Sequence, residues 1–117
     1  MEMKEVMAQQ VFVVVGNTLD EEKYACIIKH KMQDAGYTVY AVGKELPSLN
    51  DIPEDIDVID LCIHPVKGLK LMQECAKSFR CVVIQPGADS PELLAWLDAH
   101  QIPYLQGCLL KGLEAYR

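Results

Sequence analysis

A run of apolar residues near the start of the chain ends at residues that can bind an anion. Residues 11–15 (VFVVV) lead directly into Gly16, Asn17 and Thr18, and a helical pattern follows. A strand that ends at a glycine and precedes a helix is typical of the first unit of nucleotide-binding α/β domains. The turn exposes backbone N–H groups and the helix presents the positive end of its dipole, so this segment predicts a phosphate-binding turn.

Four more strand-like runs end at short segments rich in glycine, proline and polar residues. These segments are Val42-Gly43-Lys44, Ile63-His64-Pro65, Gln85-Pro86-Gly87 and Gln106-Gly107-Cys108. Open α/β sheets bind their ligands at the carboxyl ends of the strands. In a parallel sheet all of these segments share that edge, so their residues are candidates for a ligand site.

Groups for catalysis or metal binding are not clustered in the sequence. The histidines, His30, His64 and His100, are scattered, and no order of serine, histidine and aspartate suggests a catalytic triad. The five cysteines lack Cys-x-x-Cys spacing, and their odd number and largely apolar surroundings predict free thiols. We therefore expect no catalytic residue and no bound metal.

Strand and helix patterns alternate along the chain and would position these segments. Strands are predicted at residues 11–15, 38–42, 58–63, 81–84 and 103–105, and helices at residues 19–35, 65–79 and from Pro91 onward. A helical turn is expected at residues 48–52, a last turn or helix at residues 108–116, and a short helix or flexible extension at residues 1–10. Thr18 and Glu21 have the spacing of a capping box for the first long helix, and Gly36 is expected to end it.

The alternation of strands and helices predicts the fold class. Strands separated by helices imply right-handed crossovers and a parallel sheet. We predict a single Rossmann-like, doubly wound α/β domain over residues 1–117. Its five parallel strands are expected in the order 3-2-1-4-5, with helices on both faces of the sheet.

Charge and hydropathy exclude several classes of partner. The net charge is −6, from 11 basic and 17 acidic residues, and no basic stripe of the kind that binds nucleic acid is present. No apolar run reaches the roughly 18 residues of a membrane span. Residues 1–5 lack the apolar core of a secretion signal, so we expect a cytoplasmic protein. The carboxylates of Glu54, Asp55, Asp57 and Asp60 are predicted to form a solvated loop and strand edge.

The turn after the first strand departs from the dinucleotide fingerprint G-x-G-x-x-G. Gly16 is present, but Thr18 and Glu21 occupy the second and third glycine positions. Gly43 and Lys44 stand where an acidic residue would hold a ribose hydroxyl. Unmodified NAD is therefore disfavoured, and a more highly phosphorylated adenine nucleotide fits better.

Acidic residues near the candidate turn act against anion binding. Asp20, Glu21 and Glu22 fall in the first turn of the predicted helix, where carboxylates stabilise the helix and repel phosphate. Glu45 follows Lys44 and weakens the case for a phosphate contact there. A ligand-free interaction domain with a decayed nucleotide site is therefore one alternative.

Several short motifs occur in a defined order along the chain. They are Val14-Val15-Gly16, Lys23-Tyr24, residues 36–42 (GYTVYAV), residues 46–54 (LPSLNDIPE), residues 56–60 (IDVID), residues 83–87 (VIQPG) and Cys108. This set resembles the small stand-alone CoA-binding domains of bacteria, which are related to the CoA-binding domain of the succinyl-CoA synthetase α subunit. The resemblance covers about residues 11–111.

The resemblance implies a Rossmann-like fold that binds CoA by its nucleotide end. We expect a module that binds CoA or an acyl-CoA and lacks catalytic machinery of its own. The resemblance implies a phosphate loop formed by Gly16, Asn17 and Thr18, with Lys23 and Tyr24 beside it. The adenosine would be bordered by Val42, Gly43 and Lys44, and its adenine side would be closed by Ile63, His64, Pro65 and Lys67. The pantetheine arm would be followed by Gln85, Pro86 and Gly87. Cys108 would lie near the ligand thiol, either as packing or as a thiol that forms a mixed disulfide under oxidation. Asn17-Thr18, Gly43-Lys44 and His64 depart from the usual residues of the family.

A function of another class is a further alternative. The chain would then be an NAD(P)-type dinucleotide-binding protein or a small oxidoreductase. We expect a small-molecule nucleotide as the ligand and a second copy of the chain or a partner enzyme as the protein partner. Nucleic acid and membranes are not expected as partners.

Overall fold

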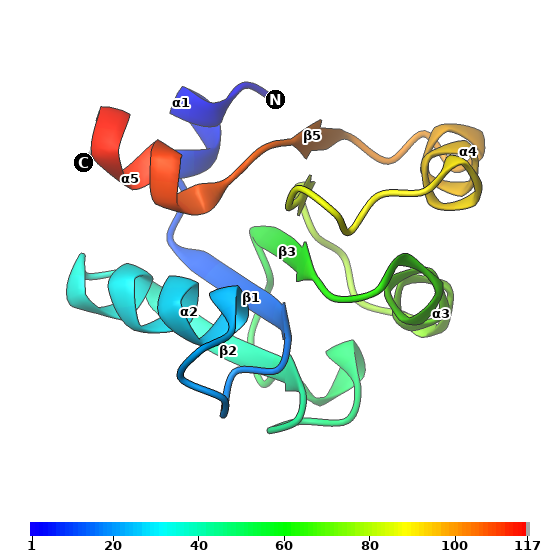
Figure 1. The fold of residues 1–117 in the computed structure, drawn as a ribbon. Coiled ribbons are helices and arrows are strands. Elements are labelled where there is room, and N and C mark those ends of the chain that lie inside the picture. The colour runs from blue at the N-terminus through cyan, green and yellow to red at the C-terminus, as the bar shows by residue number, and fades with distance from the viewer. Residues whose placement is uncertain (117) are drawn as a thin grey trace.

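The apolar runs of the sequence form one parallel sheet (Figure 1). The computed structural model describes residues 1–116. The strands are β1 (Val11–Gly16), β2 (Thr38–Gly43), β3 (Val58–Cys62), β4 (Cys81–Ile84) and β5 (Tyr104–Gln106), and their order in the sheet is β2-β1-β3-β4-β5. The predicted α/β class and the five-stranded parallel sheet are confirmed.

Helices cover both faces of the sheet. They are α1 (Met3–Met7), α2 (Tyr24–Asp34), α3 (Pro65–Glu74), α4 (Pro91–Ala99) and α5 (Leu109–Tyr116), with a short 3₁₀ turn, η1 (Leu49–Asp51). Side chains of α1, α2 and α5 pack on one face, and side chains of η1, α3 and α4 pack on the other. None of these helices is long and apolar enough to cross a bilayer.

The place of β3 differs from the expected order 3-2-1-4-5. β3 lies between β1 and β4 and pairs with both, whereas β2 occupies the edge. Burial explains this arrangement, because the first four residues of β3 are fully buried while the first three of β2 are only half-buried. A strand buried on both faces is stable in the middle of a parallel sheet, where neighbours on both sides satisfy its backbone.

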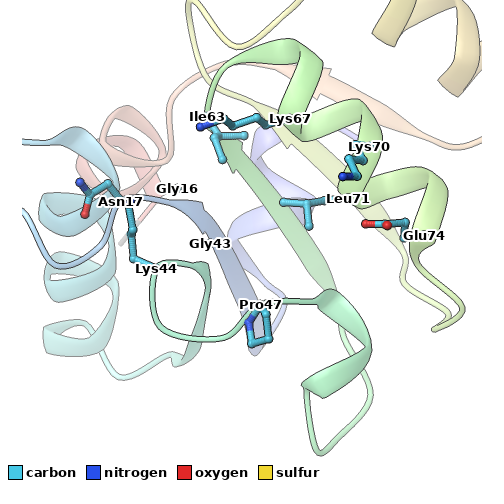
Figure 2. A pocket seen from close by; sticks show the side chains of 10 residues that line it. All are labelled: Gly16, Asn17, Gly43, Lys44, Pro47, Ile63, Lys67, Lys70, Leu71 and Glu74. Carbon is cyan, nitrogen blue, oxygen red and sulfur yellow. The ribbon is translucent and has the colours of Figure 1, made fainter.

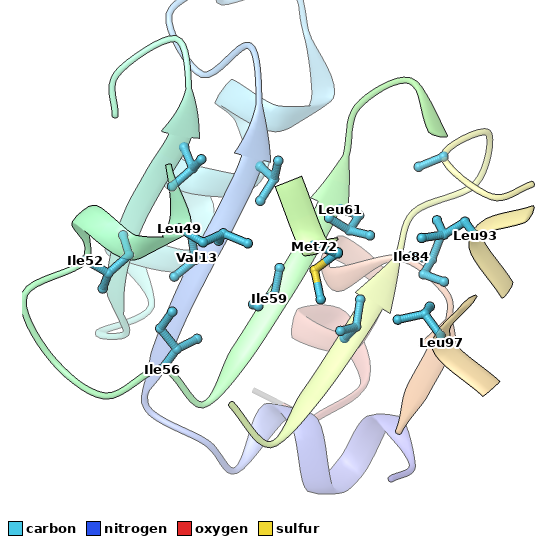
Figure 3. Close-up of a cluster of buried hydrophobic side chains, with 14 residues drawn as sticks. Val13, Leu49, Ile52, Ile56, Ile59, Leu61, Met72, Ile84, Leu93 and Leu97 are labelled. Carbon is cyan, nitrogen blue, oxygen red and sulfur yellow. The ribbon is translucent and has the colours of Figure 1, made fainter. Parts of the chain in front are cut away.

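One of the two core clusters lies beneath α3, α4 and η1 (Figure 3). Met72 of α3 and Leu93 and Leu97 of α4 project onto the same sheet face as Ile59 and Ile84. Each fully buried side chain of this size contributes about 1.5–3 kcal/mol through removal of apolar surface from water. This burial holds α3, which carries part of the candidate site, against the sheet.

The N-terminal segment is a helix that packs on the opposite face. Val6 and Met7 of α1 are buried, and the Tyr37 hydroxyl donates a hydrogen bond to the Met7 carbonyl oxygen. A Cβ at Gly112 of α5 would lie 2.8 Å from the sulfur atoms of both Met3 and Met7. Glycine therefore allows the close approach of α1 and α5. Of the two forms expected for residues 1–10, a short helix and a flexible extension, the structure shows the helix.

Helix α2 begins at Tyr24, so the predicted start at residue 19 and the Thr18–Glu21 capping box are wrong. The Asn17 side chain accepts hydrogen bonds from the backbone N–H groups of Leu19 and Asp20 at 3.3 and 3.2 Å. Such side-chain bonds to the local backbone compete with helix formation and favour a turn. The carboxylates of residues 20–22 therefore precede the helix and do not occupy its first turn.

Candidate functional site

The crossovers that leave the carboxyl ends of β1 and β3 pass over opposite faces of the sheet. The crossover through α2 packs on one face, and the crossover through α3 packs on the other. Helices that diverge to opposite faces leave a crevice at the sheet edge between them, and α/β proteins bind ligands there. With β3 next to β1, this crevice lies between the residues that follow Gly16 and Cys62.

A cleft of about 560 Å³ opens at this edge (Figure 2). It is lined by Gly16, Asn17, Gly43, Lys44, Pro47, Ile63, Lys67, Lys70, Leu71 and Glu74. We call it the lysine cleft, because Lys44, Lys67 and Lys70 line it with Glu74 as the single carboxylate. Its lining comes from the ends of β1, β2 and β3 and from one side of α3. The cleft is therefore locally basic in a protein of net charge −6.

Close backbone packing makes glycine necessary at the start of this cleft. A Cβ at Gly16 would lie 2.4 Å from the Cys62 carbonyl oxygen and 2.9 Å from the Cβ of Ala25. Any side chain at this position would push β3 and α2 away from β1. Gly16 thus sets the separation of the elements that surround the crevice.

Backbone donors remain available beside Gly16. In the described part of the chain, the backbone N–H groups of Asn17 and Thr18 have no acceptor, and neither do those of Tyr24 and Ala25 at the start of α2. The carboxylate of Asp20 accepts from the Glu22 backbone N–H at 3.0 Å and leaves these donors unoccupied. Unpaired N–H groups and a helix N-terminus suit an anionic ligand.

The Thr18 side chain does not line the lysine cleft. It is 2% exposed and its hydroxyl donates a hydrogen bond to Glu45. Lys29 Nζ lies 3.0 and 2.8 Å from the two carboxylate oxygens of Glu45. The hydrogen bonds from Lys29 and then from Thr18 lower the pKa of the Glu45 carboxyl. Glu45 is thus paired with Lys29, and within residues 1–116 Lys44 forms no ion pair.

The His64 side chain caps helix α3. Its Nδ1 atom accepts a hydrogen bond from the Val66 backbone N–H at 3.2 Å and caps α3, with Pro65 in the first turn. An imidazole that caps a helix is held at the rim of the crevice by its own backbone contact. His64 and Pro65 do not line the lysine cleft, although Ile63 and Lys67 on either side of them do.

The other residues that the resemblance implied are distributed over several places. Val42 is completely buried in the core, and Lys23 is the N-cap residue of α2. Tyr24, Gln85 and Pro86 line a second cleft. A Cβ added at Gly87 would meet nothing within 4 Å.

Four residues of the lysine cleft were missed by the sequence reasoning. They are Pro47, Lys70, Leu71 and Glu74. A signal for three of them was present, because Lys70, Leu71 and Glu74 follow Lys67 at intervals of three, four and seven residues. These intervals place side chains on one side of a helix.

The second cleft, of about 380 Å³, lies on the other side of the sheet edge. It is lined by Tyr24, Cys62, Gln85, Pro86, Cys108, Leu110, Lys111 and Glu114. We call it the thiol cleft, after Cys62 and Cys108. Cys62 lines the thiol cleft and the next residue, Ile63, lines the lysine cleft, because successive residues of a strand point to opposite faces.

A buried carboxyl lies near the thiol cleft, at Asp60 of β3. The prediction that Asp60 is solvated is wrong, because its exposed fraction is 0%. Among residues 1–116 neither carboxyl oxygen has a hydrogen-bond partner, and burial raises the pKa of Asp60 well above its ordinary value. Burial, followed by the charges of Asp60 and Cys108, raises the pKa of the Cys62 thiol to about 12. Within residues 1–116 no group of histidine, cysteine or carboxylate side chains could hold a metal ion.

A family model described as a CoA binding domain matches residues 10–114. The chain belongs to the CoA binding domain family. Among proteins with curated descriptions, none matches this CoA binding domain. The match spans both clefts and every strand of the sheet.

Solved structures of small proteins share the fold. A hypothetical protein from Pyrococcus horikoshii OT3 is 22% identical, with a TM-score of 0.85 over 96% of this chain and 87% of its own. A conserved hypothetical protein from Pyrococcus furiosus is 23% identical, with a TM-score of 0.74 over 92% and 99%. A protein from Thermus thermophilus is 19% identical, with a TM-score of 0.77 over 100% of both chains. At these identities the similarity establishes the architecture.

Proposed function

We propose that this CoA binding domain binds CoA or an acyl-CoA through its phosphates in the lysine cleft and has no catalytic group of its own. The observation that carries the proposal is the convergence of Lys44, Lys67 and Lys70 on the crevice beside Gly16. CoA carries a diphosphate and a ribose phosphate, and these need several cations at separate points. The phosphate loop would be residues 16–17, with Thr18 supporting it through Glu45.

Electrostatics favour a multiply charged anion in this cleft. Because Lys29 neutralises Glu45, the charges that remain on the lining are those of the lysines and of Glu74. A concave basic surface in an acidic protein concentrates anions locally while the rest of the surface repels them. The volume of about 560 Å³ lies in the range of about 300–1,000 Å³ usual for small-molecule sites.

The proposed role is to hold or sense the ligand. The His64 Nδ1 lone pair is taken by the Val66 N–H, so that atom cannot accept a substrate proton. The Asp60 carboxyl is fully buried and lines neither cleft. A module of this kind would act by delivering the bound thioester to a partner enzyme or by buffering the free ligand.

Thermal unfolding with increasing CoA tests the proposal. A ligand that binds only the folded state raises the midpoint of unfolding, by an amount that grows with ligand concentration. Lys67→Glu should raise the dissociation constant by about tenfold or more, since it places a carboxylate among phosphates. Lys31→Glu is the matched control, because Lys31 is an exposed α2 lysine that lines neither cleft.

The same titration separates the alternative functions. Binding of NADPH without binding of CoA would favour the dinucleotide alternative. A chain that binds neither at millimolar concentration would be the ligand-free interaction domain. Mass spectrometry of the protein purified under native conditions would identify a nucleotide that co-purifies with it.

A further inference from the structure

The edge of the sheet that carries the lysine cleft also carries exposed apolar side chains. Leu19, Tyr24 and Val66 are 64%, 67% and 70% exposed. Leu19 and Tyr24 follow β1, and Val66 follows β3 in the first turn of α3, so all three lie at the carboxyl edge of the sheet. Large apolar side chains that are scattered singly are normal on a protein surface, whereas several on one edge mark a surface that contacts another protein.

An acidic strip directly follows Leu19 and consists of Asp20, Glu21 and Glu22. Asn17 lines the lysine cleft, and its side chain accepts hydrogen bonds from the Leu19 and Asp20 backbone N–H groups, which holds the start of the strip beside the cleft (Figure 2). The Glu21 and Glu22 side chains are exposed and line neither cleft. Within residues 1–116 the strip forms no ion pair. It therefore offers unpaired carboxylates next to a basic cleft.

The lysines of the cleft are unpaired as well. Lys44, Lys67 and Lys70 are exposed, and in the described part of the chain none of them forms an ion pair. Charges of both signs thus lie next to each other on one edge without a partner inside the chain. A twofold axis through this edge places the acidic strip of each copy against the lysines of the other, because an isologous interface uses the same surface twice. The edge is therefore complementary in charge to a second copy of itself.

We propose that two copies of the chain associate through this edge, with the acidic strip of each copy at the lysine cleft of the other, and that CoA dissociates the dimer. The carboxylates of the strip take the place of the ligand phosphates, since both are anions that pair with lysine. Leu19 and Val66 are removed from water in the interface, which adds an apolar contribution to the association. The acidic strip thus resembles the ligand in charge and occupies the same cleft.

The effect of CoA rests on the proposed function, because the ligand and the acidic strip compete for the same lysines. The dimer is then the ligand-free form, and the monomer is the form that holds the ligand. By thermodynamic linkage, CoA weakens the association of the two copies, and the association lowers the apparent affinity for CoA. An interface that depends on exposed charges also weakens as the salt concentration rises.

Analytical ultracentrifugation of the ligand-free protein tests the association. We expect a reversible equilibrium between monomer and dimer at protein concentrations up to about 1 mM. The equilibrium should shift toward the monomer when NaCl rises from about 0.05 to about 0.5 M. A monomer at every protein concentration would overturn the proposal, and so would a dimer that salt does not weaken.

Paired charge reversals locate the interface. The variants Glu21→Lys/Glu22→Lys and Lys67→Glu/Lys70→Glu should each raise the dimer dissociation constant about tenfold or more, because like charges then face each other. An equimolar mixture of the two variants should dimerise again, since the reversed strip of one then faces the reversed lysines of the other. A mixture that stays monomeric would contradict the proposed interface.

A matched control and an apolar variant complete this test. Asp34→Lys/Asp55→Lys makes the same change in net charge with two exposed carboxylates at the opposite edge of the sheet, and it should leave the dimer intact. Leu19→Ser should raise the dimer dissociation constant roughly tenfold, because it removes buried apolar surface. Tyr116→Ser, at the C-terminal end of α5, should have no such effect, although Tyr116 is 51% exposed. Equal effects of the edge variants and their controls would overturn the proposal.

Addition of CoA distinguishes failure of this inference from failure of the proposed function. CoA should shift the unmodified sequence toward the monomer, whereas sodium sulfate at the same ionic strength should have a smaller effect. Glu21→Lys/Glu22→Lys keeps the lysine cleft, so CoA should still raise its thermal midpoint. A normal rise together with a dimer that CoA does not dissociate overturns the inference and leaves CoA binding intact. The absence of any rise in either protein overturns the proposed function, and the mixed charge reversals still report on the interface.

Discussion

Gly43 lies directly against the backbone of Gly16, the residue with which it pairs across β1 and β2. A Cβ at Gly43 would be 2.8 Å from the Gly16 carbonyl oxygen, and the φ angle of Gly43 is +125°. Glycine at position 43 thus lets the end of β2 approach the turn after β1 more closely than a residue with a side chain would. This contact brings Lys44 to the lysine cleft beside Asn17.

Replacement of Gly43 by alanine should therefore destabilise the protein. The positive φ costs about 1 kcal/mol or more, and displacement of the Gly16 carbonyl adds to it. Gly87→Ala is the matched control, because Gly87 has a φ of +90° but its Cβ would meet nothing within 4 Å. Urea unfolding should show a larger loss of stability for Gly43→Ala, and equal losses would mean that the close contact contributes nothing.

The Thr18–Glu45–Lys29 cluster should stabilise the fold above acidic pH only. Its hydrogen bonds lower the pKa of Glu45 below that of the unfolded chain, so its contribution is present at neutral pH and is lost as pH falls through the lowered pKa. Glu45→Gln should lose about 1 kcal/mol of unfolding free energy at pH 7. The difference from the unmodified sequence should disappear in acid, as measured by chemical unfolding at several pH values. A difference that is constant with pH would contradict this role.

Asp60 should give the opposite pH dependence. Its pKa is raised in the folded state, so the unfolded chain releases the proton first and stability falls as pH rises above the unfolded value of about 3.8. One such group contributes a slope of at most about 1.4 kcal/mol per pH unit. Asp60→Asn removes the ionisation and should flatten the curve between acidic and neutral pH. Parallel curves for the two proteins would show that folding does not shift the pKa of Asp60.

The His64 cap should affect stability more than ligand affinity. His64→Ala removes the acceptor for the Val66 N–H and should cost about 0.5–2 kcal/mol, while His64→Asn should restore most of it. Both variants should bind CoA with nearly unchanged affinity in a calorimetric titration. A large loss of affinity in His64→Asn would instead place the imidazole on the ligand.

Much of the architecture was predictable because it depends on local patterns. Glycine and proline mark the ends of the apolar runs, and the period of the apolar residues separates strands from helices. Ser90 and Pro91 begin α4 as expected, with the Ser90 hydroxyl accepting from the Leu93 N–H at 3.1 Å. Gly16, Gly43 and their neighbours could be named as candidate site residues from the same local patterns, because the carboxyl ends of parallel strands share one edge of the sheet.

The sequence by itself determined the strands, the parallel sheet and the edge at which candidate residues gather, because each depends on residues close together in the chain. Only the tertiary structure decided that β3 lies beside β1, which moves the crevice to the ends of these strands. It also decided that Thr18 bonds to Glu45, 27 positions away, and that Asp60 is enclosed in the core. Such relationships depend on which faces the crossovers cover, and pairing and burial between distant segments leave no local pattern in the sequence.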